Sequence, residues 1–263
     1  MSGILQARSR DEPGGPDLPP RFIFMLTRDD LTVPDARNKL PVIVESGVRD
    51  VGAKDIGLPR DELIGLFADL RAAGCTTYLE VVSETPEAVI DSARAALAIR
   101  PDYVIGGTEV ETTQEILAGS GIRFFPYIGR VVGHPCLLRG SIDEIAADGR
   151  RVEAAGVDGI NLLAYRYDGN VDALVQAVLG AVSVPVICAG SIDSEARIGA
   201  MRRLGVWAFT IGTAVLDGAI VPGHPLVDQL RRVLDLAGAP AVPSDGSPAP
   251  GGAAVARADR NAG

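Results

Sequence analysis

The amino-acid sequence predicts a single (β/α)8 barrel of the TIM type, and three observations support this fold class. The chain has 263 residues, a typical length for one such barrel. Eight apolar, strand-like runs alternate with helix-like runs at intervals of about 20 to 36 residues, the length of a β–α–β unit. Hydrophobic residues make up 47% of the chain and aromatic residues only 5%, so small branched side chains must fill the core, as in the layered interior of a barrel.

The expected strands are the runs with near-continuous apolar character. In chain order they are Phe22–Leu26, Asp50–Lys54, Thr77–Val82, Tyr103–Ile105, Arg123–Tyr127, Gly159–Leu163, Pro185–Ala189 and Trp207–Ile211. Alternation with helices implies a parallel sheet with right-handed crossovers. An open doubly wound sheet usually carries a glycine-rich turn after its first strand, but here Thr27-Arg28-Asp29-Asp30 follows. The sequence therefore favours a closed barrel.

The helices between these strands are expected from their capping signals. The clearest is Ser141-Ile-Asp-Glu144, a capping box in which the serine caps the helix and the glutamate reaches back to it. This helix should end at Gly156, because glycine readily adopts the left-handed conformation that follows a helix. On similar signals, further helices are expected from about Pro34 to Glu45, from Pro59 to Gly74, from Ser191 to Gly205 and from Pro225 onward.

Both ends of the chain are expected to be disordered tails. Residues 1–20 and 239–263 are rich in Pro, Gly, Ala, Ser or Asp and show no hydrophobic periodicity. The barrel is therefore expected at residues 21–238.

The composition also bears on partners and location. The formal net charge of −9 argues against a nucleic acid or a membrane surface as partner. No apolar run reaches the roughly 18 residues of a membrane span. The three cysteines are odd in number and lack metal-ligand spacing, which is typical of a reduced setting. We expect a cytoplasmic protein, and a homo-oligomer is compatible with the sequence.

The loops after the last two strands indicate a phosphate site. In TIM barrels a phosphate often binds the loops after strands seven and eight, which here contain Gly190-Ser191 and Gly212-Thr213. Each glycine stands where backbone must approach a ligand closely, and each precedes a hydroxyl side chain. Residues 214–217 are expected to form a short helix whose N-terminal N–H groups face the anion. The alternative is that both glycines only relieve crowding at strand ends.

The segment that contains these loops also resembles a known group of enzymes. Residues 186–216, VICAGSIDSEARIGAMRRLGVWAFTIGTAVL, are similar to the phosphate-binding end of the ribulose-phosphate-binding barrel superfamily. That group includes N-acetylmannosamine-6-phosphate epimerase, ketogulonate- and orotidine-phosphate decarboxylases, and isomerases of tryptophan and histidine biosynthesis. The resemblance implies a phosphate role for Gly190, Ser191, Gly212 and Thr213, and no particular reaction.

Two charged residues in apolar strands are the main catalytic candidates. Lys54 ends the second strand, and only Lys39 and Lys54 among the 25 basic residues are lysines. Glu80 lies inside the third strand, where a carboxylate must be paired. As neighbours, the two could form an acid–base pair for enolisation, and Lys54 could instead form a Schiff base. The alternatives are a structural salt bridge and a solvated lysine.

Other polar residues are weaker candidates. Asn161 in the sixth strand could bind a substrate oxygen or make a structural hydrogen bond, and Tyr167 could cover the site. Weaker substrate contacts are expected at the strand ends from Arg28, Asp29, Thr108, Arg130, His134 and Tyr165. The chain has two histidines, His134 and His224, which do not suit a paired-histidine metal site, so neither a metal nor a cofactor is expected. The alternating Asp and Lys pattern of the decarboxylases is incomplete.

These features predict a cofactor-free isomerase or epimerase that transfers a proton next to a carbonyl of a small phosphorylated sugar or related metabolite. Two alternatives stay open. One is an aldolase or decarboxylase that uses Lys54 on a phosphorylated keto compound. The other is a non-enzymatic sensor of a phosphometabolite.

Overall fold

The computed structural model describes residues 18–83, 85–133 and 135–238, which fold as the predicted barrel. The strands of the barrel are β1 (Arg21–Met25), β4 (Asp50–Lys54), β5 (Thr76–Val81), β6 (Tyr103–Gly106), β7 (Arg123–Phe125), β10 (Ile160–Leu162), β11 (Val186–Cys188) and β12 (Ala208–Ile211). Each overlaps a strand expected from the sequence. The tails expected at residues 1–20 and 239–263 lie outside the described residues, apart from 18–20.

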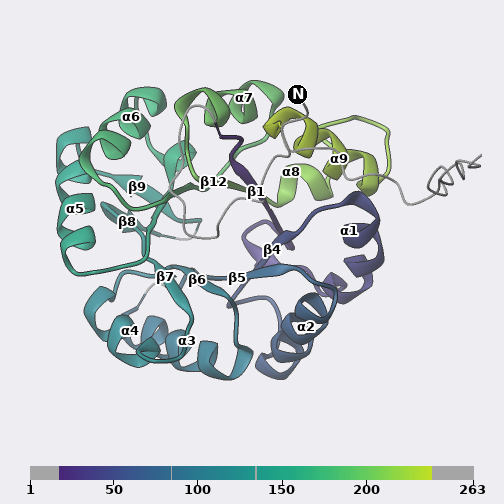
Figure 1. Cartoon of the computed structure of the whole chain (residues 1–263), viewed down its shortest axis with the longest axis horizontal. Helices are drawn as coiled ribbons and strands as arrows, with labels where there is room; N and C mark the ends of the chain where they lie inside the picture. Colours follow the sequence, from purple (N-terminus) through teal and green to yellow (C-terminus); the bar gives the residue numbers. More distant parts are fainter. Residues whose placement is uncertain (1–17, 84, 134, 239–263) are drawn as a thin grey trace, which may run out of the picture.

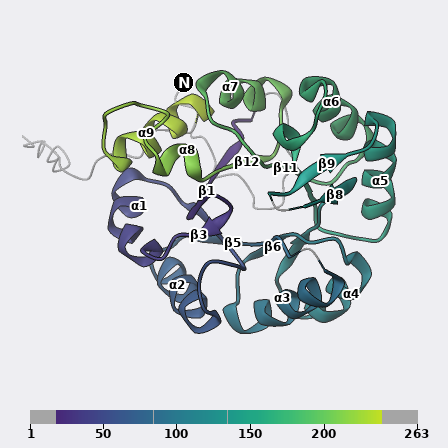
Figure 2. The same cartoon turned by 180° about the vertical axis from the view of Figure 1, so that it is seen from behind.

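The eight strands form one parallel sheet in the order β10-β11-β12-β1-β4-β5-β6-β7. A parallel bridge between Tyr127, just beyond β7, and Asn161 in β10 joins the two edges of the sheet, so the barrel closes. Figures 1 and 2 show the helices as a ring around it. They are α1 (Leu40–Ser46), α2 (Arg60–Ala72), α3 (Pro86–Ile99), α4 (Val110–Leu117), α5 (Ile142–Ala154), α6 (Val171–Ala181), α7 (Glu195–Leu204), α8 (Thr213–Leu216) and α9 (Leu226–Ala237), with 3-10 segments η1 (Ala36–Lys39) and η2 (Ala164–Arg166).

Two helix starts differ from the sequence prediction. The helix expected from about Pro34 begins instead as η1 and continues as α1, with Pro41 in the first turn of α1, where its missing N–H costs no hydrogen bond. The helix expected from Ser191 begins at Glu195 with Ser194 as its cap, because Ser191 adopts a left-handed φ of 54°. The capping box at Ser141 is confirmed.

Aromatic side chains fill the end of the barrel at which the strands begin. The rings of Tyr78 and Tyr103 are stacked with their centroids 4.7 Å apart, and Trp207 lies 5.9 Å from Tyr103. All three side chains are buried inside the barrel, in a cluster that is separate from the larger apolar core between the sheet and the helices. The open space is therefore at the opposite end, where the strands end.

Two short antiparallel hairpins follow β1 and β7. The first consists of β2 (Thr27–Arg28) and β3 (Leu31–Thr32), and the second of β8 (Arg130–Val132) and β9 (Leu137–Arg139). Asp29 and Asp30 form the two-residue turn of the first hairpin, with φ values of 49° and 64°. Such a turn needs two residues with positive φ, which aspartate tolerates better than most residues.

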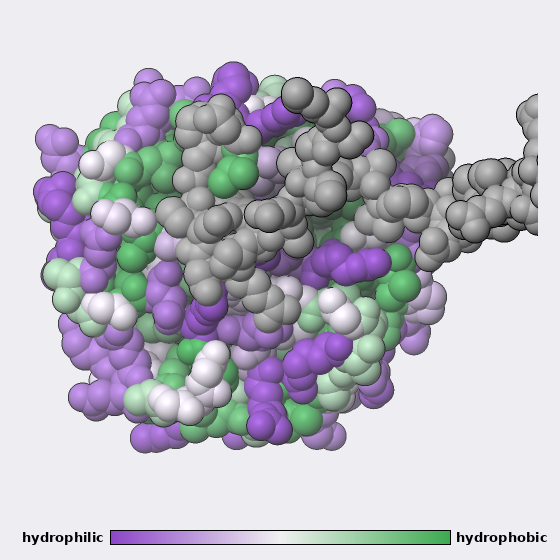
Figure 3. All heavy atoms as spheres, viewed as in Figure 1, coloured by the Kyte–Doolittle hydropathy of each residue, from purple (hydrophilic) through white to green (hydrophobic). Residues whose placement is uncertain are grey.

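The face in Figure 3 carries hydrophilic residues around most of its rim, with smaller hydrophobic areas between them. Within residues 18–238, leaving aside 84 and 134, no helix combines the length and the apolar character needed to cross a membrane.

Candidate active site

A pocket of about 730 Å³ lies where the barrel strands end. The ends of β1, β4, β5 and β12 contribute to it, together with the first hairpin and the segments after β7, β10 and β11. Such a volume suits a small metabolite. The pocket brings the predicted Lys54 and Glu80 together with the predicted loops at Gly190-Ser191 and Gly212-Thr213.

Lys54 and Glu80 face each other across neighbouring strands. They are direct partners in the register of β4 and β5, so both side chains point to the same side of the sheet. The Lys54 Nζ lies 3.7 Å from the Glu80 Oε2, and the two side chains are only 9% and 6% exposed. Two opposite charges this deeply buried form an ion pair that water screens weakly.

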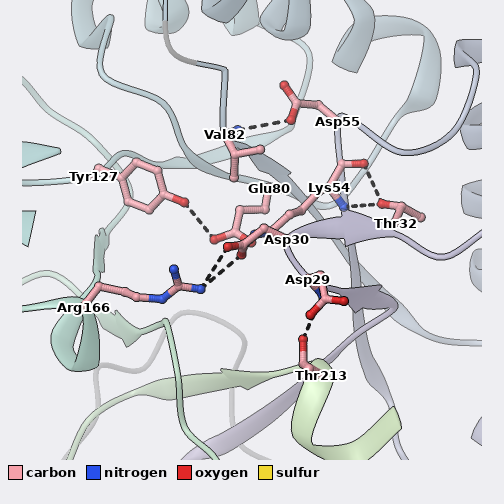
Figure 4. A network of polar contacts seen from close by, with 10 residues as sticks. All are labelled: Asp29, Asp30, Thr32, Lys54, Asp55, Glu80, Val82, Tyr127, Arg166 and Thr213. Atoms are coloured by element: carbon pink, nitrogen blue, oxygen red, sulfur yellow. Dashed lines mark hydrogen bonds and ion pairs between the residues drawn. The ribbon is translucent and has the colours of Figure 1, made fainter. Parts of the chain in front are cut away.

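Asp30 is the closest partner of Lys54 and was missed by sequence reasoning, which selected Asp29. The Asp30 Oδ1 lies 2.5 Å from the Lys54 Nζ, and Arg166 Nη2 donates to both carboxylate oxygens of Asp30, at 3.2 and 3.0 Å. Arg166 is the last residue of η2 and was also not predicted. Figure 4 shows Asp30, Lys54, Glu80 and Arg166 pointing toward one another.

Several hydrogen bonds hold this charged cluster in place. The Tyr127 hydroxyl donates to the Glu80 Oε1 at 2.8 Å. Thr32, in the first hairpin, bonds the Lys54 backbone through its hydroxyl, which accepts from the N–H at 2.8 Å and donates to the carbonyl at 2.9 Å. Asp55, next to Lys54, accepts from the backbone N–H of Val82 at 3.1 Å. The chain that carries the cluster is therefore fixed on both sides (Figure 4).

The pKa values of Lys54, Asp30 and Tyr127 are shifted by burial and by the charges of their neighbours. Burial alone lowers the pKa of Lys54, but the negative charges of Glu80 and Asp30 outweigh it and raise that pKa above its usual value. Burial raises the pKa of Asp30, but the charges of Lys54 and Arg166 outweigh it and lower that pKa. Burial and the nearby Glu80 carboxylate raise the pKa of Tyr127 well above its usual value. At neutral pH, Lys54 is therefore an ammonium and Tyr127 a neutral hydrogen-bond donor.

The two glycine loops both line the pocket, and each glycine also has a packing role. A Cβ at Gly212 would lie 2.5 Å from the Thr27 Oγ1 and 2.6 Å from the Thr27 carbonyl oxygen. Gly190 has a φ of +81°, and a Cβ there would lie 2.5 Å from the Arg166 Cγ. The short helix expected after Gly212 is present as α8, and the Thr213 hydroxyl accepts from the Asp29 N–H at 3.2 Å. The packing alternative thus accounts for part of the glycine pattern.

The other predicted residues are distributed unevenly around the site. Asp29 lines the pocket, whereas Thr108 and Arg130 are absent from its lining. Arg28 instead bonds Asp217 at 2.7 Å and the Leu216 carbonyl at 2.9 Å. His134 lies outside the described residues.

Three more candidates are absent from the lining of the pocket. Asn161 is fully buried in β10, and neither its amide nitrogen nor its amide oxygen has a hydrogen-bond partner among the described residues. Tyr165 packs under Arg197, whose guanidinium carbon is 4.7 Å from the ring centroid. Tyr167 also packs against the core outside the lining. Among the residues that the structure describes, no group of three or more His, Cys, Asp or Glu could hold a metal ion.

The chain is similar to known proteins in its structure. No family model matches the chain, and no curated protein matches it. The N-acetylmannosamine-6-phosphate 2-epimerase from Clostridium perfringens is similar at 12% identity and a TM-score of 0.55, covering 74% of this chain and 86% of that one. Orotidine 5'-phosphate decarboxylase from Pyrococcus horikoshii OT3 is similar at 13% identity and a TM-score of 0.57, covering 82% and 98%. The YdjI aldolase from Escherichia coli K12 is similar at 14% identity and a TM-score of 0.57, covering 84% and 92%.

These similarities confirm the (β/α)8 barrel. Two of the three structures also belong to enzyme types in the superfamily that residues 186–216 resemble. At such low identities the likeness concerns the fold alone, so the reaction has to be inferred from the site.

Proposed function

We propose that this protein is a cofactor-free isomerase or epimerase that moves a proton next to a carbonyl of a small phosphorylated sugar or related metabolite. The observation that carries the proposal is the convergence of Lys54 and Glu80, 3.7 Å apart, in the same pocket as the loops at Gly190-Ser191 and Gly212-Thr213. One part of the pocket would hold the phosphate group and the other would act on the carbonyl.

The proton-transfer roles follow from the charges. Glu80, as a carboxylate, would take the proton from the carbon next to the carbonyl. The ammonium of Lys54 would stabilise the negative oxygen of the resulting enolate and return a proton, because positive charge is most useful where negative charge develops. Tyr127 fixes one oxygen of Glu80 and leaves the other facing Lys54. A positioned acid or base of this kind typically contributes a factor of about 10² to 10⁴ in rate.

A lyase is the second candidate, supported by the carboxylates of Asp30 and Glu80 on both sides of Lys54. A Schiff base requires a neutral amine, whereas these carboxylates raise the pKa of Lys54 and keep it charged. Among lyase mechanisms, the site therefore favours one in which Lys54 acts through its charge, as in a decarboxylation.

Hydrogen exchange in deuterated water tests the isomerase proposal. The full chain is incubated with a panel of sugar phosphates, phosphorylated keto acids and their unphosphorylated counterparts, and deuterium next to the carbonyl is followed by NMR. We expect exchange and turnover only with phosphorylated compounds, and a loss of about 10² to 10⁴ in Glu80→Gln. Exchange that persists unchanged in Glu80→Gln would contradict its role as the base.

The two lysines of the chain supply a matched control. Lys39 pairs with Asp35 at 3.0 Å and does not line the pocket, so Lys39→Met should keep full turnover whereas Lys54→Met should lose it. Unchanged turnover in Lys54→Met would remove its role. Borohydride trapping of a substrate adduct on Lys54 would favour a Schiff-base lyase, and ligand binding without conversion across the panel would favour a sensor.

A further inference from the structure

The charge of the pocket raises a problem for an anionic substrate. Five carboxylates and two cationic side chains line it among the described residues. The carboxylates are Asp29, Asp30, Glu80, Asp193 and Asp217, and the cations are Lys54 and Arg166. A phosphorylated substrate would add further negative charge, which the two cations would offset.

Both cations already bind one carboxylate, that of Asp30. Lys54 contacts its Oδ1 at 2.5 Å, and Arg166 Nη2 contacts both of its oxygens at 3.2 and 3.0 Å. Two of the other carboxylates have arginine partners outside the lining, Asp193 with Arg197 and Asp217 with Arg28. Asp30 is therefore the lining carboxylate that contacts both cations, whereas Glu80 pairs with Lys54 alone.

Arg166 has a further hydrogen-bond donor that its contacts with Asp30 do not use. Its Nε is buried and has no hydrogen-bond partner among the described residues, although an unsatisfied buried donor is costly. Its side chain runs against Gly190, where a Cβ would lie 3.4 Å from the Nε. Arg166 thus extends from the first hairpin to the loop after β11, with donors on a fork that matches an oxyanion.

We propose that Arg166 is a specificity-determining residue that binds an oxyanion of the substrate. In the absence of substrate, the Asp30 carboxylate occupies the position of that oxyanion. The inference rests on the proposed function, because it assumes an anionic, phosphorylated substrate. A substrate carboxylate or phosphate oxygen displaces the Asp30 carboxylate from Lys54 and Arg166, so the cations exchange one anionic partner for another. Rotation of the short Asp30 side chain is sufficient, while Thr32 keeps the base of the hairpin bonded to Lys54.

Binding measurements on charge variants test this exchange. Isothermal titration calorimetry of the full chain is carried out with glycerol 3-phosphate, which has one anionic end, and phosphoglycolate, which has a phosphate and a carboxylate. The variants are Asp30→Asn, Arg166→Gln and the double variant. Asp193→Asn is the matched control, since it removes the same charge from the same lining but from a carboxylate paired with Arg197.

We expect Asp30→Asn to bind phosphoglycolate about tenfold more tightly, which corresponds to about 1.4 kcal/mol. Asp193→Asn should give a clearly smaller gain, Arg166→Gln should bind more weakly than the wild type, and the gain should be absent from the double variant. A gain with both compounds would identify the phosphate as the displacing group, and a gain with phosphoglycolate alone would identify the carboxylate.

Equal effects of Asp30→Asn and Asp193→Asn, or a gain that persists in the double variant, would overturn the exchange while leaving the proposed function intact. Failure of the wild type and all variants to bind either compound or inorganic phosphate would instead overturn the phosphate-binding part of the proposed function, and this inference with it. Thermal unfolding without ligand establishes that each variant is folded.

Discussion

Replacing Tyr127 with phenylalanine removes a single hydroxyl from the centre of the site. That hydroxyl donates to the Glu80 Oε1 at 2.8 Å, and both residues are buried. Hydrogen bonds to charged groups contribute about 1.5 to 3 kcal/mol to the free energy of unfolding. For a domain of this size each kcal/mol corresponds to about 2 to 4 °C in Tm, so Tyr127→Phe should melt roughly 3 to 12 °C below the wild type. Differential scanning calorimetry measures this shift.

The barrel contains a matched control for this change. Tyr78 donates to the Asp50 Oδ1 at the same distance of 2.8 Å and is fully buried, but Asp50 begins β4 whereas Lys54 ends it. Tyr78→Phe should therefore lose comparable stability at the opposite end of the barrel. Only Tyr127→Phe should also slow the deuterium exchange assigned to Glu80. Equal exchange rates in the two variants would refute the role of Tyr127 in orienting that carboxylate.

Three further predictions concern other parts of the molecule. Gly190→Ala and Gly74→Ala each place an alanine at nearly the same positive φ, which costs about 1 to 2 kcal/mol of strain. Only a Cβ at position 190 meets Arg166, so only Gly190→Ala should also weaken phosphoglycolate binding measured by calorimetry. Equal binding by the two variants would contradict this. Because the pKa of Asp30 is lowered in the folded protein, its carboxylate contributes to the free energy of unfolding. This contribution is complete above the ordinary pKa of 3.8 and is lost as the pH falls through the lower pKa of the folded state. Urea unfolding between about pH 2 and 5 should therefore show a steeper loss of stability for the wild type than for Asp30→Asn, and parallel curves would exclude this contribution. Burial raises the pKa of Cys188 to about 12, so its thiol should react with a disulfide reagent at neutral pH only after unfolding, as mass spectrometry of the labelled peptide would establish.

The proximity of Lys54 and Glu80 could be predicted because it depends on the pairing of two strands. Lys54 and Glu80 lie in consecutive strands of a parallel sheet, and consecutive strands usually pair. The structure pairs these two residues directly, so both side chains enter the interior. A shift of one residue in this register would have turned one of them outward, and the sequence contains no signal that excludes such a shift.

Asp30 and Arg166 could not be predicted because their roles depend on turn geometry. Asp29 and Asp30 have the same side chain and are adjacent, yet the left-handed turn directs the Asp30 carboxylate to Lys54. Arg166 is one of many arginines in the chain, and it reaches Asp30 across 136 residues of sequence. Its neighbour Tyr165, which was predicted, packs instead against Arg197.

The sequence by itself determined the elements of this protein: eight strands, the helices between them and the glycine loops after the last two strands. These are set by local periodicity, capping residues and turn chemistry, which act over a few residues. Only the tertiary structure decided which charges meet in the pocket. Closing the barrel brings the ends of the first, second, third and sixth strands and the loops that follow them to one mouth. The ion pairs of Lys54 and Arg166 with Asp30 and Glu80 therefore form between residues that are far apart in the chain.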